Sequence, residues 1–202
     1  MKNAGKGAKV FIIGIILICL VLGYYYYLSN KRADSVKETK VKITAVQEAL
    51  MYDFERNYPP TPKEVVKLFG QITQCFYNEE YTEEEFGRLA LAIEKLYDAE
   101  LIANKTHNQY LEDLKWDVEQ MKKDNIVISN YATSASTDVD YFSQDGFDWA
   151  RLYCAFSLRQ GTKRDAINEI FLLRKDEEGH WKIYGWTAAD DENGEAEELQ
   201  EE

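Results

Sequence analysis

Histidine, cysteine and proline are scarce in this sequence, and their scarcity excludes several classes of protein. Among 202 residues there are two histidines, three cysteines and three prolines. No Cys or His residues stand at the spacing of a zinc site. The sequence also lacks a phosphate-binding loop, a dinucleotide fingerprint and a His-Glu-x-x-His motif. We therefore expect neither a metal nor a cofactor, and the sequence identifies no catalytic residue.

Basic residues are outnumbered by acidic ones. Lys and Arg number 24 against 36 Asp and Glu, which gives a net charge of −12. Nucleic acids are bound through clustered Lys and Arg that contact phosphates. This charge balance excludes nucleic acid as a partner.

The three cysteines do not form a disulfide framework. Cys19 lies in an apolar segment, so only Cys75 and Cys154 remain as a candidate pair within the main domain. Spacing alone does not show that two cysteines meet. We favour two buried thiols that pack as small apolar side chains, and a disulfide stays open.

One long apolar run follows a basic tail at residues 1–9. Residues 10–28 (VFIIGIILICLVLGYYYYL) carry no charge, and as a helix they extend about 28 Å, close to the hydrocarbon thickness of a bilayer. We therefore predict a transmembrane helix at 10–28. Tyrosine favours the membrane–water interface, and long Lys and Arg side chains reach it. Six residues are expected there: Tyr24, Tyr25, Tyr26, Tyr27, Lys31 and Arg32.

The orientation of this span is inferred from its flanks. Lys2, Lys6 and Lys9 precede it and resist export, whereas long domains translocate largely regardless of charge. We expect a single-pass protein of the cell membrane, with the lipid bilayer as one partner and the C-terminal domain extracytoplasmic. A signal peptide cleaved at 21–23 has the same basic start and stays open as an alternative.

The rest of the chain divides into a polar juxtamembrane linker at 29–56, a folded domain at 57–188 and a disordered acidic tail at 189–202. All three prolines lie at Pro59, Pro60 and Pro62, where they forbid a continuing helix and mark the start of the domain. The tail has too few apolar residues to order itself.

Helical periodicity covers the first half of the domain. Thr61 and Thr82 each stand at an N-cap with Glu three residues later, the arrangement of a capping box. Apolar residues at helical spacing predict helices at 62–78, from Thr82 onward, and at 107–123. The second of these continues as far as 104 in the widest interpretation.

After residue 125 the apolar period changes from helical to two. Strands are predicted at 126–132, 148–160, 166–175 and 181–188, with 138–146 a polar, acidic loop. The order of helices and then antiparallel strands predicts an α+β fold. We expect about three helices packed on a curved antiparallel sheet of about four strands.

Two resemblances follow from short segments. Residues 174–183 (RKDEEGHWKI) resemble the last strand pair of the nuclear-transport-factor-2-like, or cystatin-like, cone fold. Residues 57–68 (NYPPTPKEVVKL) and 74–81 (QCFYNEEY) resemble an uncharacterised family of single-pass membrane proteins from anaerobic Gram-positive bacteria. The second resemblance implies an anchored extracytoplasmic domain and transfers no functional residue.

Two functional hypotheses from different classes result. Aromatic and Arg side chains are typical interface anchors, and five of them are expected together on the outer sheet face: Trp149, Arg151, Tyr153, Tyr184 and Trp186. They favour a membrane-tethered, non-enzymatic binding or assembly module of the cell envelope, with a second copy or an envelope protein as partner.

The alternative is a domain that binds or hydrolyses a small molecule in the pocket of the cone. Tyr110, Trp116 and Asp117 are the candidates to line that pocket. A deep pocket with convergent polar groups and a perturbed carboxylate favours this alternative. A filled cone with an apolar outer face favours the assembly module.

The predicted orientation is testable in whole cells. Protease added to intact protoplasts should digest the domain, because the export-resistant lysines keep only the N-terminus inside. A tag placed before Met1 should stay protected and serves as the control. Full protection of the domain contradicts the predicted orientation.

Overall fold

The computed structural model describes residues 43–189 of the chain. No helix in this range is both long and apolar enough to cross a bilayer. The predicted span at 10–28, its six interface residues and the tail from 190 onward lie outside the described residues.

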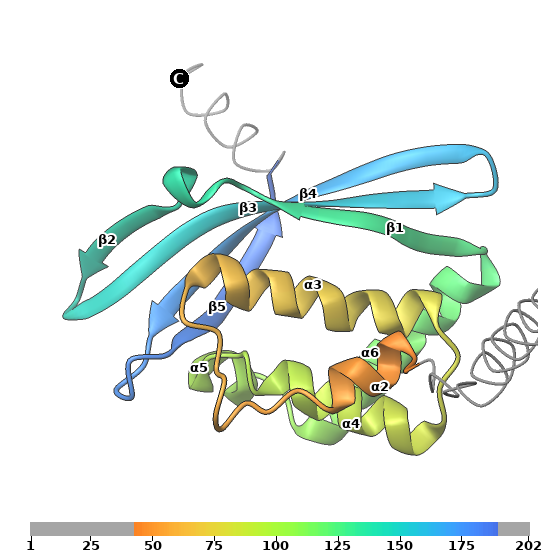
Figure 1. The fold of residues 1–202 in the computed structure, drawn as a ribbon, viewed down its shortest axis with the longest axis horizontal. Helices are drawn as coiled ribbons and strands as arrows, with labels where there is room; N and C mark the ends of the chain where they lie inside the picture. Colours follow the sequence, from red (N-terminus) through yellow and green to blue (C-terminus); the bar gives the residue numbers. More distant parts are fainter. Residues whose placement is uncertain (1–42, 190–202) are drawn as a thin grey trace, which may run out of the picture. The chain divides into compact units, whose positions relative to one another are not determined.

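The described residues form five α-helices, one short 3-10 helix (η1, Ser136–Asp138) and five strands, which confirms the α+β class. The five α-helices lie on one side of the antiparallel sheet (Figure 1). α3 lies directly against the sheet, and α2 and α4 pack on α3 and on each other. The helices are α2 (Ala45–Leu50), α3 (Pro62–Asn78), α4 (Glu83–Glu94), α5 (Ala99–Ala103) and α6 (His107–Lys123).

The helix starts follow their caps. Thr61 accepts a hydrogen bond from the backbone N–H of Glu64, and α3 has the predicted bounds. Thr82 and Glu85 form a full capping box at α4. Thr106 forms another with the side chain of Gln109 at α6. Each box satisfies backbone N–H groups that the helix leaves free.

The sheet has the order β1-β3-β4-β5, and β2 pairs with the other half of β3. Along β3 the residues that face the helices are buried and alternate with exposed ones, as expected for a sheet covered on one face. Its strands are β1 (Ile126–Thr133), β2 (Asp140–Gln144), β3 (Phe147–Gln160), β4 (Lys163–Lys175) and β5 (Trp181–Ala188).

The predicted loop at 138–146 is wrong, because most of it is β2. Asp145 and Gly146 both have positive φ and connect β2 to β3 as a two-residue hairpin turn, which an Asp-Gly pair favours. Polar residues in β2 concealed the strand, since its outer edge pairs with no described strand. The sheet therefore has five strands rather than about four.

The number of helices is also higher than expected. α2 lies within the range predicted as a linker, yet its Val46 and Ala49 are buried. The compact unit begins at Thr44, earlier than the predicted start at 57. α5 is separate from α4, because the chain bends at 95–98 to meet the sheet.

Cys75 and Cys154 are free thiols, both buried. Burial raises the pKa of Cys75 to about 11 and that of Cys154 to about 12. Since the thiolate is the reactive form, these residues behave as packed apolar side chains.

A buried ion pair joins the helices to the sheet. Asp98 has only 5% of its side chain exposed and accepts two hydrogen bonds from the guanidinium of Arg174, at 2.6 and 3.0 Å. The same carboxylate accepts a hydrogen bond from the backbone N–H of Glu100 and so caps α5. Rings of Phe147, Trp149 and Tyr184 lie 4.7, 5.6 and 5.0 Å from the guanidinium carbon.

Removing one partner of this pair should destabilise the fold strongly. Asp98→Ala leaves Arg174 with only the exposed carboxylate of Glu100, at 2.7 Å, as an ion-pair partner. The loss should therefore approach the lower end of the roughly 3–5 kcal/mol seen for a buried charge left uncompensated. Urea titration monitored by circular dichroism measures the loss of free energy of unfolding. Asp98→Asn can still cap α5 but carries no charge, so its stability shows how much of the loss comes from the ion pair rather than from the cap.

The exposed pair of Lys105 and Asp113 provides the control. Asp113→Ala should cost less than about 1 kcal/mol, because exposed ion pairs contribute little. Equal losses in Asp98→Ala and Asp113→Ala contradict the assigned role of the buried pair.

Candidate functional site

A cavity of about 550 Å³ lies between the sheet and the helices. Four helices, α3 to α6, line one side, and all strands except β2 contribute to the other. A volume of this size is typical of sites that hold a small molecule. The space between the sheet and the helices is therefore not filled by side chains at this end.

Four aromatic side chains form one wall of the cavity: Phe69, Tyr97, Tyr110 and Trp186. The Trp186 ring lies 5.6 Å from Phe69 and 5.8 Å from Tyr97, centroid to centroid. Behind it, Phe171 stacks at 5.9 Å and is fully buried. Trp186 itself is 41% exposed, so this wall presents aromatic surface to whatever enters.

Glu169 places a carboxyl group on the sheet side of the same cavity. Its neighbours across the ladder are Cys154 on β3 and Ala188 on β5. Trp186 pairs with Phe171, which makes it the diagonal neighbour of Glu169 on this face. The Glu169 side chain forms no hydrogen bond or ion pair with any residue in the range 43–189.

The environment of Glu169 disfavours its charged form. Burial raises the pKa of Glu169 to about 7, because a desolvated carboxylate loses hydration that nothing here replaces. Tyr77 on α3 is coupled to it: burial and the charges of Asp117 and Glu169 raise the pKa of Tyr77 to about 12. The Tyr77 hydroxyl therefore stays protonated at neutral pH.

A second polar group in the cavity has no partner. Thr73 lines it from α3, and its hydroxyl is buried without a hydrogen bond to any described residue. Buried polar groups are nearly always satisfied, and exceptions often mark sites where a ligand or water binds. Glu169 and Thr73 thus supply two unpartnered polar groups to the cavity.

Charged residues gather at the edge of the cavity. Glu94 contacts His107, with Oε2 and Nδ1 2.8 Å apart, and Asp113 pairs with Lys105. Asp117 is exposed on α6. Together with Glu169, four carboxyl groups line the cavity against one lysine.

The structure separates the five residues predicted on the outer sheet face. Trp149 and Tyr184 meet there, with ring centroids 5.0 Å apart, and both contact Arg174. Arg151 forms an ion pair with Asp140 of β2. Tyr153 is 49% exposed.

The placement of Trp186 on the outer face is wrong. A bulge between Leu172 and Leu173 shifts the β4–β5 register and brings Trp186 opposite the inward-facing Phe171. Trp186 therefore belongs to the cavity. Alternation counted through Tyr184 does not detect such a bulge.

The sequence candidates for the pocket are placed unevenly. Tyr110 and Asp117 line the cavity, whereas Trp116 is 63% exposed and is not among its lining residues. Glu169 was missed. It has the same parity as Phe171 and Leu173 on β4, both fully buried, so a carboxylate at a core-facing strand position was the available signal.

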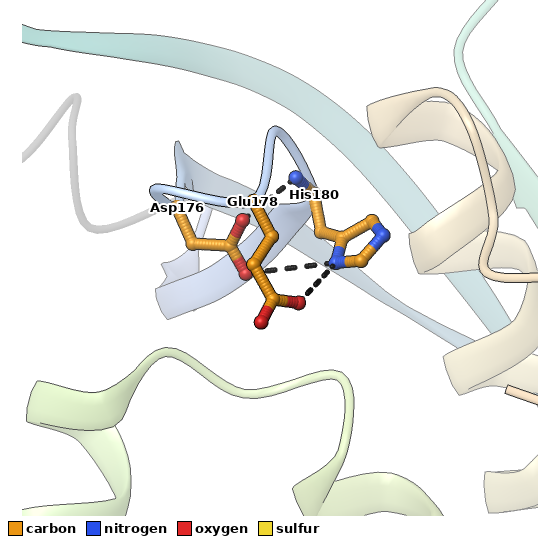
Figure 2. Close-up of side chains that lie close together, drawn as sticks. All are labelled: Asp176, Glu178 and His180. Atoms are coloured by element: carbon orange, nitrogen blue, oxygen red, sulfur yellow. Dashed lines mark hydrogen bonds and ion pairs between the residues drawn. The ribbon is translucent and has the colours of Figure 1, made fainter. Parts of the chain in front are cut away.

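A second cluster lies at the β4–β5 hairpin, where His180 Nδ1 points at the carboxylates of Asp176 and Glu178 (Figure 2). The separations are 3.8 and 3.4 Å, and one atom of each side chain lies within 4.8 Å of the others. Such a set can ligate a cation. The ammonium of Lys182, 3.9 Å from Asp176, already supplies a positive charge, which makes the cluster a poor metal site. Its ion pairs instead stabilise the β4–β5 hairpin.

These features define an α+β domain with a cavity beneath one end of its sheet, lined by aromatic side chains and carboxyl groups. The chain belongs to the family described as Domain of unknown function (DUF6715), whose model matches residues 1–186. This confirms the expectation of an uncharacterised domain. No curated protein matches the chain.

The perturbed carboxyl group predicts a specific pH dependence. Because the folded protein holds the Glu169 proton more tightly than the unfolded chain, stability should be lost as pH rises from about 5 to about 8. Glu169→Gln should flatten this slope. At pH 8 the free energy of unfolding of Glu169→Gln should exceed that of the wild type by about 2 kcal/mol, after allowance for partial solvent contact.

Denaturant titrations at four pH values measure this effect. Glu119→Gln, at an exposed position on α6, is the control and should track the wild type. A wild-type stability that rises steadily over the same pH range, with no effect of Glu169→Gln, contradicts the assignment.

Proposed function

We propose that the domain binds a small, largely apolar molecule in the cavity between its sheet and its helices. The cavity with two unpartnered polar groups, Glu169 and Thr73, carries this proposal. An unpaired buried polar group costs free energy, and a ligand that completes its hydrogen bonds recovers that cost. Of the two functional hypotheses, the small-molecule site is therefore better supported than the assembly module.

The proposed setting is the surface of a cell membrane. The apolar segment at 10–28 supports a tether, and the family match includes that segment. We propose an extracytoplasmic orientation and a cone fold of the nuclear-transport-factor-2 type. The long α3 beneath an antiparallel sheet and the closing β4–β5 hairpin support that fold.

Hydrolysis is the second candidate, and Glu169 is the observation that favours it. A carboxyl group that titrates near pH 7 is suited to general acid–base catalysis. An assembly role through the outer face is less well supported, because Trp149 and Tyr184 are engaged by Arg174 within the domain.

Fluorine NMR of the full chain labelled with 5-fluorotryptophan tests ligand binding at this site. Trp186 reports on the cavity, and Trp149 reports on the opposite face. Members of a library of small aromatic compounds should shift the Trp186 resonance and leave that of Trp149 in place.

Matched variants at one position sharpen the test. Thr73→Phe fills the cavity from α3 and should reduce binding at least ten-fold. Thr73→Val keeps the volume, removes the unpartnered hydroxyl and should keep apolar compounds bound. If no compound moves Trp186, or if Thr73→Phe leaves every shift intact, the proposal fails.

A further inference from the structure

The charge and the aromatic lining of the cavity restrict what it can hold. Resting on the proposed function, we infer that the ligand is an organic cation with an apolar body, its positive charge seated between Glu169 and the aromatic wall. Trp186 and Glu169 are diagonal neighbours on the inner sheet face, so one cationic group can contact the carboxylate and a ring face together.

Aromatic faces attract cations because the ring quadrupole is negative on its face. The wall takes its rings from four places in the chain: Phe69 on α3, Tyr97 between α4 and α5, Tyr110 on α6 and Trp186 on β5. Trp is the strongest of these cation binders. A chamber that combines such rings with an unpaired carboxylate selects ammonium groups over neutral ones.

The charge of the lining excludes an anion as the preferred ligand. Four carboxyl groups and only one ammonium group line the cavity, and that ammonium, from Lys105, already pairs with Asp113. A ligand carboxylate or phosphate placed beside Glu169 meets a like charge, which disfavours binding. Lys105 lies at the edge and offers no compensation inside.

The carboxylate form of Glu169 is needed for this recognition, so affinity depends on pH. Tyr77 on α3 and Cys154 on β3 face the same carboxyl and keep their protons at neutral pH. Tyr97 and Tyr110 likewise have raised pKa values through burial. At the edge, Glu94, Asp113 and Asp117 contribute negative charge.

Three probes of similar shape and different charge separate the alternatives. Benzyltrimethylammonium is the cation, neopentylbenzene is its neutral isostere and phenylacetate is the anion. Each is titrated into the full chain, held in nanodiscs of uncharged lipid that lacks amines, with the Trp186 fluorine resonance as the readout.

The cation should bind at least ten-fold more tightly than the neutral isostere at pH 8, and phenylacetate should bind most weakly. Between pH 6 and pH 8 the affinity for the cation should rise about ten-fold, as the fraction of ionised Glu169 rises. The neutral probe should not change.

Glu169→Gln should remove both the preference for the cation and its pH dependence, while neopentylbenzene binds within two-fold of wild type. His107→Gln is the control for the histidine beside Glu94, because histidine ordinarily titrates in the same range. This variant should keep the pH dependence.

The outcomes separate this inference from the function on which it rests. If neopentylbenzene or phenylacetate binds as tightly as the cation, the cavity is a ligand site and the inferred charge is wrong. A cation preference that survives Glu169→Gln overturns the role of Glu169. If none of the three probes moves Trp186, the proposed function fails together with the inference.

Discussion

The paired charges of Asp98 and Arg174 hold the helical layer to the sheet. Beside this pair, the backbone of Ile183 exchanges hydrogen bonds with Leu96 and Asp98, so the chain between α4 and α5 lies along the edge of β5. Asp98 faces the guanidinium, and the preceding Tyr97 lies on the cavity side, against Trp186. A single short segment therefore fixes both the join of the two layers and the aromatic wall.

The two ends of the inner sheet face differ in how they are covered. Toward the β4–β5 hairpin, Leu152, Leu173 and Ile183 are fully buried. Toward the β3–β4 turn, Ile167 is 44% exposed and Glu169 stands where a large apolar side chain is expected. The helices do not extend beneath the tip of the β3–β4 hairpin (Figure 1). The inner face is therefore closely packed near the β4–β5 hairpin. Near the β3–β4 turn it leaves a cavity large enough for a ligand, and Glu169 lies there.

Local patterns in the sequence predicted most of the framework. The cap of α3 and the period-two alternation of β3 located these two elements to within a residue, and the cap of α4 located its start, since each depends on near neighbours in the chain. Trp186 was misplaced because the β4–β5 bulge sets its register. The cavity and the isolation of Glu169 depend on which side chains fail to meet, and no local pattern contains that information.

α2 determines how mechanical load enters the folded unit. The compact unit begins at Thr44, and α2 inserts Val46 and Ala49 between α3 and α4. Any tension carried by the preceding residues is therefore applied first to a helix of six residues. Its small contact area makes it the weakest link in series, so it should peel away before the sheet shears.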